Sequence, residues 1–421
     1  MVLELPFEME FILSLTYRCN LNCSMCTQYG DGFKQNAPAD MSVRQWANFF
    51  ESVSDVNPKP KMLLMGGEPL LYRDFAKLFE LTQKYGFNVQ IVTNGVLLDK
   101  YLEQIAKTDT TITISIDGLE DTHDAIRNKK GTFKKVMENI EKIEAYQKTG
   151  SKIKLCINCV MLPDNIDELT DFLMFIQQKN IKTLTFQHLQ FSTEELNKHT
   201  NIQWRERLNK NYSGGLIPPK FYKTDKDYIK KLIKTIDSFK DVCKTTTFVF
   251  PALEDEEIEN YYLDNNLDEI RAGRICTTPW VNPTIHSNGD VSNCVGNIIG
   301  NINNEDFWTI WNNDKANRLR NSLCKNGKFT ICAKCCNFYK GNFIYAKDSV
   351  LKVNGKLLSL PDEINYINSS KNGVFILDKY RDKTIKNVTP VIPIETFTPA
   401  SVKDLQKTET IVAKFSELKG A

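Results

Sequence analysis

The 421-residue sequence predicts an α/β protein built on a parallel sheet. Two observations lead to this prediction. Short apolar runs of strand type recur through the first 190 residues, and segments with the apolar spacing of amphipathic helices lie between them. Strands that alternate with helices of about 10–15 residues are typical of βαβ units. With 41% hydrophobic residues, the chain can also bury a large core, and its length predicts two or three domains.

Six strands are expected in the first part of the chain, each from an apolar run of strand length. They cover residues 9–15, 62–65, 87–95, 111–118, 152–162 and 182–191. Five helices are expected between these strands, because apolar residues recur there every three or four positions. They cover residues 43–53, 75–85, 97–106, 133–146 and 166–178. In parallel barrels the chemistry lies at the carboxyl ends of the strands, so motifs that follow a strand are candidates for a site.

Three cysteines follow the first strand at an unusual spacing. Cys19, Cys23 and Cys26 form a C-x3-C-x2-C pattern in the run TYRCNLNCSMC. Three thiolates can hold three irons of a [4Fe–4S] cube and leave the fourth iron without a protein ligand. The odd count therefore predicts a cluster whose open iron binds a reactant. The alternative is a zinc knuckle, but zinc sites usually have four ligands close together, and no further Cys or His follows within 90 residues.

A second motif, MLLMGGEPLL, follows the second strand. Gly66 and Gly67 lack a Cβ, so their backbone can come within hydrogen-bonding distance of a ligand. Glu68 offers an acceptor for a cationic amine. A bare GGEP is typical of an ordinary turn. Its place after a strand, about 40 residues beyond the three cysteines, makes it their expected partner.

Together these motifs resemble the radical SAM superfamily. The resemblance implies that the three cysteines ligate a [4Fe–4S] cluster, that its open iron chelates S-adenosylmethionine (SAM), and that an electron from the cluster cleaves SAM to a 5′-deoxyadenosyl radical. It also implies that the six strand–helix units form a partial (β/α)6 barrel of TIM-like type. One departure is Met25, because the family prefers an aromatic residue before the third cysteine. The polarizable sulfur of Met25 can still pack against adenine.

The resemblance also implies a set of SAM contacts. The stretch that ends at Pro69 would bind the amino group of SAM. Ser115 and Asp117, in SIDG at the end of the fourth strand, would contact the ribose and the carboxylate. Arg127 would pair with the carboxylate through its guanidinium fork, and Asn94 ends the third strand near the same ligand. The alternatives are a turn for Asp117 and a solvated surface charge for Arg127.

A second set of cysteines lies further along the chain. Cys276 and Cys294 enclose Gly289 in a C-x12-G-x4-C pattern, and Cys332 and Cys335 follow as C-x2-C after a helical stretch. This pattern resembles the SPASM/twitch extension of radical SAM enzymes and implies one auxiliary [4Fe–4S] cluster with these four ligands. The Asn-Gly pair at 288–289 predicts a tight hairpin, which would bring Cys276 and Cys294 across from each other. A zinc ribbon is the alternative.

The remaining cysteines have different expected roles. Cys156 and Cys159 look like small apolar residues of a buried strand. Cys324 and Cys336 flank the auxiliary ligands. Three roles stay open for each of them: a structural residue, a replacement for one of the four ligands, or a free thiol that donates a hydrogen atom to a substrate radical.

The motifs divide the chain into four parts. Residues 1–192 are expected to form the partial barrel, 193–274 a helical bridging region and 275–337 the auxiliary cluster domain. Residues 338–421 form a C-terminal extension with β structure, since VLKVNGKLLSL carries a hairpin signal at Asn354 and Gly355.

The charge composition of the chain limits the classes of binding partner that are expected. The formal net charge is +2, with 54 Lys and Arg against 52 Asp and Glu, which favours neither nucleic acid nor an anionic membrane as a partner. No apolar run approaches the roughly 18 residues of a membrane span, and many cysteines without an evident disulfide pattern imply a reducing cytoplasm. The resemblance implies an electron donor such as flavodoxin or ferredoxin.

The substrate follows less directly. His188, which lies with Gln187 and Gln190 at the end of the sixth strand, is either a base or a hydrogen-bonded wall. The resemblance implies hydrogen abstraction from a C–H bond and an oxidation helped by the auxiliary cluster, in a peptide that is modified or cross-linked. The alternatives are dehydrogenation or epimerisation of a small aminocyclitol or sugar. A non-catalytic iron–sulfur or zinc scaffold does not explain GGEP, SIDG and the odd cysteine count together.

Overall fold

The computed structural model describes residues 3–4, 8–26, 38–214, 224–264, 266–270, 274–339 and 343–345. Its central feature is a ten-stranded sheet with the order β13-β12-β11-β2-β4-β5-β6-β7-β8-β9. The predicted hairpin at Asn354 and Gly355 lies outside the described residues, as does everything after residue 345. Within the described residues, no helix has the length and apolar character needed to cross a membrane.

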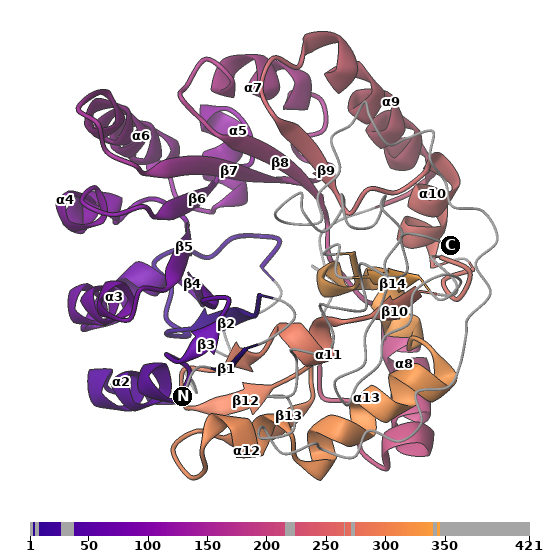
Figure 1. The fold of residues 1–421 in the computed structure, drawn as a ribbon. Helices are drawn as coiled ribbons and strands as arrows, with labels where there is room; N and C mark the ends of the chain where they lie inside the picture. The colour runs from indigo at the N-terminus through magenta and orange to yellow at the C-terminus, as the bar shows by residue number, and fades with distance from the viewer. Residues whose placement is uncertain are drawn as a thin grey trace, which may run out of the picture.

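The six predicted strands are present, and each pairs with the next in parallel. They are β2 (Glu10–Ser14), β4 (Lys61–Met65), β5 (Asn88–Thr93), β6 (Thr111–Ser115), β7 (Lys154–Met161) and β8 (Thr183–His188). Figure 1 shows that these strands curve into a half-barrel that is open on one side. The expected partial barrel is confirmed.

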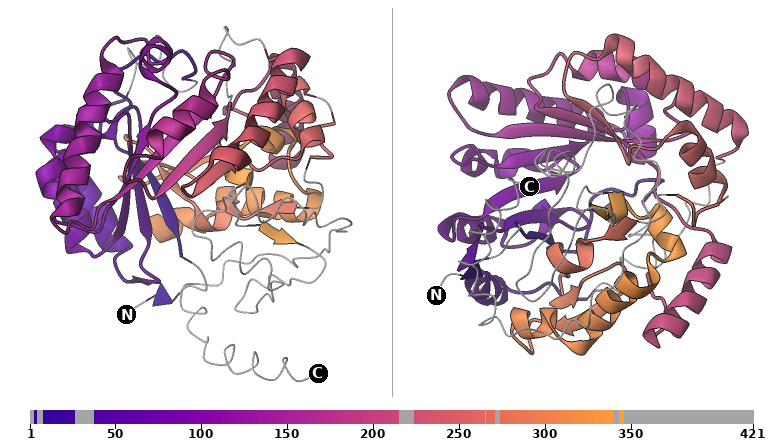
Figure 2. Two further views of the ribbon diagram at one scale, coloured as in Figure 1. Left: turned by 90° about the horizontal axis from the view of Figure 1, so that it is seen from above. Right: turned by 45° about the vertical axis from the view of Figure 1, so that its right-hand side comes forward.

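Helices cover the outer face of the half-barrel (Figures 1 and 2). They are α2 (Val43–Ser52), α3 (Phe75–Lys84), α4 (Leu102–Ile105), α5 (Glu120–Ile126), α6 (Thr132–Lys148) and α7 (Leu169–Ile176). The first of them shows why they form where they do. Ser42 and Gln45 make a reciprocal capping box at its start, and Trp46, Phe49 and Phe50 bury one face.

Several short elements were not predicted. The helix α5 has only seven residues and ends just before Arg127, which caps it. Two 3-10 turns follow strand ends, η1 (Pro69–Leu71) and η2 (Leu98–Lys100). A small parallel pair joins β1 (Leu3–Glu4) to β3 (Val56–Asn57).

The region expected to bridge the domains also contributes to the sheet. It contains α8 (Glu194–Leu208), α9 (Lys226–Val242), β9 (Thr247–Phe250) and α10 (Asp255–Leu263). The strand β9 pairs in parallel with β8 and becomes the last strand of the sheet. Among its described residues the region is therefore mostly helical, and β9 adds a strand to the sheet.

The auxiliary region is hydrogen-bonded into the barrel sheet. Its elements are β10 (Arg274–Cys276), α11 (Thr278–Val281), β11 (Thr284–Ile285), β12 (Asp290–Ser292), β13 (Ile298–Asn301), α12 (Phe307–Trp311), α13 (Asp314–Asn326), η3 (Thr330–Lys334), η4 (Cys336–Tyr339) and β14 (Phe343–Tyr345). The strand β11 pairs in parallel with β2, and β10 pairs with β14 in a separate sheet. Figure 1 shows these later elements on the open side of the half-barrel.

The predicted Asn-Gly hairpin is present between β11 and β12, and Gly289 adopts a φ of +90° in its turn. The hairpin does not contain Cys276, which lies in β10 and pairs with Phe343. The hairpin therefore does not itself place Cys276 opposite Cys294, although the two thiols do come near each other, since charge on Cys276 would raise the pKa of Cys294. The chain leaves β10 and passes through α11 before the hairpin begins.

Side chains alternate between the two faces of the barrel strands, as the strand period requires. Along β7 every second side chain is fully or almost fully buried against the helices, and the others face the barrel interior. That interior contains polar pairs: Gln90 Nε2 donates to Thr113 Oγ1 at 2.8 Å, and Asn158 Nδ2 donates to Gln187 Oε1 at 3.1 Å. The half-barrel therefore has an apolar outer layer and a polar inner face.

Candidate functional site

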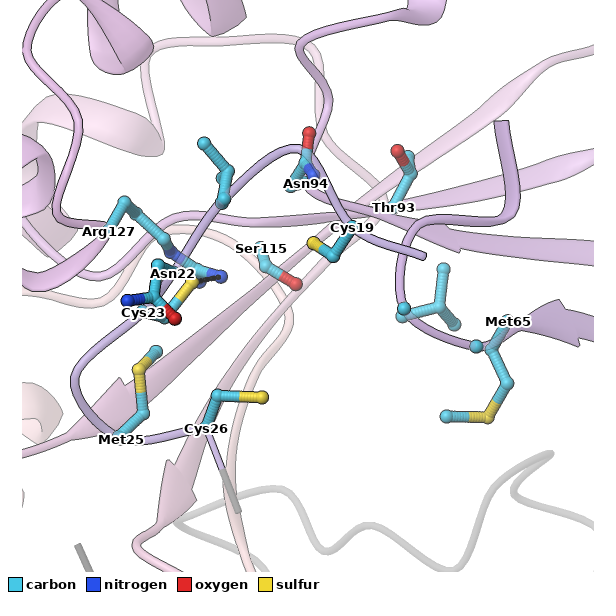
Figure 3. A pocket seen from close by; sticks show the side chains of 14 residues that line it. Cys19, Asn22, Cys23, Met25, Cys26, Met65, Thr93, Asn94, Ser115 and Arg127 are labelled. Carbon is cyan, nitrogen blue, oxygen red and sulfur yellow. Dashed lines mark hydrogen bonds between the residues drawn. The ribbon is translucent and has the colours of Figure 1, made fainter. Parts of the chain in front are cut away.

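One pocket of about 210 Å³, at the carboxyl ends of the strands, is lined by nine of the predicted site residues. The predicted residues that line it are Cys19, Cys23, Met25, Cys26, Gly66, Gly67, Asn94, Ser115 and Arg127. Figure 3 shows the cysteines on one loop, across the pocket from Met65. The structure therefore brings the cysteine motif, the glycine pair and three strand ends to one place.

Sequence reasoning missed five further lining residues: Leu21, Asn22, Met65, Val92 and Thr93. Two of them lie inside the cysteine motif. The others lie in the last two positions of β4 and β5. Their proximity to motif residues was the available signal, because every residue at the carboxyl end of a barrel strand is near the mouth.

The glycine pair holds the cysteine loop by close backbone contact. Gly67 N donates to Thr16 O and Glu68 N donates to Arg18 O, each at 2.8 Å. A Cβ on Gly66 would lie 2.4 Å from Thr16 O, and a Cβ on Gly67 would lie 2.2 Å from Arg18 O. Any side chain at either position would displace the loop that carries the cysteines. The glycines were predicted to allow close approach of a ligand. In the structure they allow close approach of the protein's own backbone at residues 16–18.

Two more contacts fix the cysteine loop over the strand ends. Ser24 N donates to Ile126 O at 2.9 Å, at the end of α5. Asn94 Nδ2 donates to Asn20 Oδ1 at 2.8 Å, at the end of β5. The loop is thus attached to β4, β5 and α5 at once, which fixes the position of its three thiols relative to the pocket.

Glu68 does not line the pocket. Its carboxylate is fully buried and accepts hydrogen bonds from Thr93 Oγ1 at 2.7 Å, Asn94 N at 2.9 Å and Leu70 N at 3.2 Å. Burial raises the pKa of Glu68 to about 7 against these hydrogen bonds. In this structure Glu68 joins the end of β4 to the end of β5. Pro69 is buried beside it as the first residue of η1. Contact of either residue with SAM stays a prediction.

Asp117 and Arg127 form a buried ion pair behind the cysteine loop. Asp117 Oδ2 lies 2.6 Å from Arg127 Nη2, and the Asp117 side chain is fully buried. Asp117 Oδ1 also accepts from Val160 N at 3.0 Å. Arg127 Nη1 donates to Cys23 Sγ at 3.7 Å. The solvated charge considered for Arg127 is therefore wrong. Asp117 does not line the pocket, and it orients the guanidinium that does.

Burial raises the pKa of Cys23, and the neighbouring Arg127 charge opposes this increase. A guanidinium beside a thiol favours the thiolate, which is the form that binds iron. The position of Arg127 therefore suits both a cysteine ligand and an anionic group in the pocket.

His188 points away from the barrel interior. It alternates with Gln187 along β8, so Gln187 faces the interior and His188 faces the helices. The His188 ring is fully buried, and its Nδ1 lies 3.1 Å from the Tyr262 hydroxyl. Burial lowers the pKa of His188 to about 3. Of its two predicted roles, the structure supports the hydrogen-bonded wall.

Five cysteines gather in the auxiliary region: Cys276, Cys294, Cys332, Cys335 and Cys336. Burial raises the pKa of Cys294 and of Cys332, and negative charge on Cys276 would raise both further. A hydrogen bond with Cys336 and burial raise the pKa of Cys335. Such mutual repulsion between thiolates is relieved when they bind a cationic centre. The structure therefore brings Cys336 close to the predicted ligands Cys276 and Cys335, and which four of the five thiols bind a cluster stays a prediction.

Cys324 stands apart from these five. Burial alone raises the pKa of Cys324 to about 12, with no contribution from another cysteine. It lies on α13, one turn after the buried Arg320, and is partly exposed. At neutral pH its side chain is a protonated thiol.

The donor set suits clusters better than single ions. Among the described residues, no three His, Cys, Asp or Glu side chains are placed to hold one metal ion. A cubane cluster takes each thiolate on a different iron, so its ligands surround a volume and do not converge on a point. The pocket lined by Cys19, Cys23 and Cys26 provides such a volume, with glycine backbone beside it. The residues present therefore fit a [4Fe–4S] cluster with three protein ligands.

Comparison with known proteins agrees with this site. Residues 13–176 match the model of the radical SAM superfamily, and residues 276–336 match the SPASM iron–sulfur cluster-binding domain. The chain therefore contains a radical SAM domain followed by a C-terminal SPASM domain. These two domains imply SAM and [4Fe–4S] clusters as cofactors. The SPASM match begins at Cys276 and ends at Cys336, the first and last of the five gathered cysteines.

Curated relatives match over part of the chain. The sporulation killing factor maturation protein SkfB of Bacillus subtilis is 30% identical over 161 residues, which are 38% of this chain and 37% of the relative. The Fe-coproporphyrin III synthase of Methanosarcina barkeri is 24% identical over 43% of this chain and 44% of its own length. The GTP 3′,8-cyclase of Listeria monocytogenes is 28% identical over 46% of this chain and 56% of its own length. The chain thus spans between about a third and just over half of these relatives.

Solved structures share the fold. Streptococcus suis SuiB bound to S-adenosylmethionine superposes with a TM-score of 0.55 at 16% identity, over 78% of this chain and 75% of that one. The anSMEcpe structure with bound AdoMet and a Cp18Cys peptide superposes with a TM-score of 0.52 at 18% identity, over 78% of this chain and 87% of that one. At this level of identity the likeness concerns the fold alone.

Proposed function

We propose that the chain is a radical SAM enzyme that modifies a peptide by oxidation. The observation that carries this proposal is the pocket in which three cysteines stand with glycine backbone, polar strand-end side chains and a buried arginine. When bound, the cluster and SAM supply a 5′-deoxyadenosyl radical, which removes a hydrogen atom from a C–H bond of the substrate. The auxiliary cluster, held by the SPASM cysteines, would accept one electron from the resulting carbon radical, which would lose a proton to solvent, so that the product has two hydrogens fewer than the substrate.

The residues of the pocket have separate roles in this proposal. Cys19, Cys23 and Cys26 bind the cluster and leave one iron for SAM. The Arg127 guanidinium, which Asp117 orients, lines the pocket and would pair with the carboxylate of bound SAM. Ser115 and Asn94 offer hydrogen bonds to the polar parts of the ligand. An external donor of the flavodoxin or ferredoxin type supplies the first electron.

Peptides are the favoured substrate class. SuiB has been solved bound to its precursor peptide SuiA, and anSMEcpe with a bound peptide, and both share this fold. SkfB is named as the maturation protein of a killing factor. In this chain the polar inner face of the half-barrel, with the Asn158–Gln187 amide pair, supports a substrate rich in amide groups.

Redox-neutral epimerisation is the second candidate, and one observation favours it. Cys324 is a protonated thiol that stands apart from the gathered cysteines, as a hydrogen-atom donor would. Turnover in deuterated water separates the two reactions. Epimerisation would add about one mass unit from solvent deuterium and would depend on Cys324, whereas oxidation would remove about two mass units without solvent label.

The proposal is tested by SAM cleavage. Anaerobically reconstituted protein with dithionite should convert SAM to 5′-deoxyadenosine, measured by liquid chromatography. Replacing Cys19, Cys23 and Cys26 with Ala should abolish this conversion, and replacing Cys243, a cysteine outside both groups, should leave it intact. Sustained cleavage in the triple variant would show that the pocket is not the site.

A further inference from the structure

A chain of three polar side chains links the cysteine loop to the SPASM hairpin. The Tyr17 hydroxyl lies 2.8 Å from His286 Nδ1, and His286 Nε2 lies 3.0 Å from Ser292 Oγ. The Tyr17 and His286 rings are stacked, with centroids 6.4 Å apart and planes inclined by 29°. The link joins segments that are 269 positions apart in sequence.

Both ends of this link lie next to proposed cluster ligands. Tyr17 precedes Cys19 by two residues, and Ser292 precedes Cys294 by two residues. The hairpin is also fixed to the strand that leads into the cysteine loop, because β11 pairs with β2 through Ile285 and Leu13. Backbone pairing and the side-chain link therefore both connect the hairpin to the start of the cysteine loop.

The imidazole makes the link specific. In a neutral imidazole one nitrogen accepts a hydrogen bond and the other donates one. His286 can therefore hydrogen-bond to Tyr17 and Ser292 at the same time in two ways. Either Nδ1 accepts from Tyr17 and Nε2 donates to Ser292, or Nδ1 donates to Tyr17 and Nε2 accepts from Ser292, and each way requires a different tautomer. Loss of the contact at one end frees the ring to turn and weakens the contact at the other end.

We propose that Tyr17, His286 and Ser292 are positioning residues that couple the radical SAM cluster loop to the auxiliary cluster loop. The coupling makes SAM binding at the first site depend on a hydroxyl in the SPASM hairpin. This inference rests on the proposed ligation of clusters by Cys19, Cys23, Cys26 and Cys294. It assigns no bond-making step to the three residues.

The first test removes the distant hydroxyl. Ser292→Ala should weaken SAM binding to the reconstituted protein by about two- to tenfold, the effect of one hydrogen bond. It should also change the SAM-induced shift in the electron paramagnetic resonance spectrum of the N-terminal cluster. Ser287→Ala is the matched control, because Ser287 lies in the same hairpin, is fully buried, and has no hydrogen-bond partner for its hydroxyl among the described residues. It should change neither quantity.

The second test is a double-variant cycle from the other end. Tyr17→Phe keeps the ring and removes the hydroxyl, and combining it with Ser292→Ala should weaken SAM binding no more than either change alone. Tyr228→Phe, which removes a hydroxyl that donates to Met161 O at 3.2 Å elsewhere in the barrel, is the control.

The outcomes separate this inference from the proposed function. Additive losses in the cycle would overturn the coupling, and so would an unchanged affinity and spectrum in Ser292→Ala with full iron content. If Ser292→Ala lowers the iron content, the coupling is tested by Tyr17→Phe and its control. SAM binding should weaken in Tyr17→Phe and stay unchanged in Tyr228→Phe, and equal SAM binding in the two variants would overturn the coupling. Wild-type protein that cannot load the N-terminal cluster would overturn the proposed function and this inference with it.

Discussion

At the scale of single residues, the ion pair of Asp117 and Arg127 is the charge arrangement on which the pocket most depends. Both side chains are buried, and the guanidinium reaches from the carboxylate to Cys23. Removing one member of a buried pair leaves the other charge without compensation, which is costly, whereas replacing both members is often tolerated.

We therefore expect Asp117→Asn to lower the free energy of unfolding by about 3–5 kcal/mol. The reason is that Arg127 keeps its charge in a site that no longer neutralises it. The measurement is urea unfolding of the apoprotein at neutral pH, followed by circular dichroism. The double variant Asp117→Asn/Arg127→Met should recover part of the loss. A cost below about 1 kcal/mol for Asp117→Asn would mean that the pair is not buried in solution.

The buried Glu68 carboxyl predicts a pH dependence of stability. Its pKa is raised from 4.5 to about 7 in the folded protein, mainly by burial. Between these values the folded state binds more protons than the unfolded state, so this group makes stability fall as pH rises from about 4.5 to 7. The loss should total about 3 kcal/mol and stop above pH 7.

Glu68→Gln removes this dependence, because the amide does not titrate. The stability difference between wild type and variant, measured by urea unfolding at a series of pH values, should shift against wild type as pH rises across that window. A constant difference from pH 4.5 to 8 would contradict the raised pKa. The absolute difference is less informative, since the amide also changes the hydrogen bonds to Thr93 and Asn94.

At the scale of elements, the position of the cysteine loop depends on the turn after β4. Gly66 has a φ of +143°, and a Cβ at this position would lie 2.4 Å from Thr16 O. A side chain there meets both backbone strain and a backbone oxygen that cannot move without the loop.

We expect Gly66→Ala to prevent loading of the N-terminal cluster while the auxiliary cluster still forms. Iron content should fall to about four per chain. Gly86→Ala is the matched control, because Gly86 also has a positive φ, +70°, but a Cβ there meets nothing within 4 Å. That variant should load fully and lose only about 1 kcal/mol of stability. Full loading of Gly66→Ala would show that the loop can shift without losing its ligands.

The same scale shows how far sequence reasoning reaches. The six strands and four of the five helices were predictable because their apolar periodicity is local. The helix expected over residues 97–106 is instead divided into η2 and the four-residue α4. The helix α5 was missed because it has seven residues and few apolar positions. The face of His188 could not be assigned from composition, although its alternation with Gln187 held the information. Motif order predicted that the SAM-site residues lie near one another. It did not predict which of them line the pocket, and Glu68 and Asp117 do not.

At the scale of the whole molecule, two separate cysteine groups predict two clusters. Reconstituted protein should contain about eight irons per chain, and the Cys19/Cys23/Cys26→Ala variant about four. Cys324→Ala should keep about eight, because Cys324 stands apart from the five SPASM cysteines. The measurement is the iron and sulfide content per chain of the wild type and of both variants. About twelve irons, or a loss of four in Cys324→Ala, would mean that the auxiliary ligands are assigned incorrectly.

The pairing of β11 with β2 was beyond prediction, because a two-residue strand has no local signal and its partner lies far away in sequence. This pairing also affects folding during synthesis. Until residues 284–285 leave the ribosome, the nascent barrel carries β2, with its buried Phe11 and Leu13, as an open edge. Open apolar edges recruit other chains, and distant pairings form slowly. The SPASM region thus extends the sheet past β2 and covers this edge, and a nascent chain that stalls before it would be prone to aggregate.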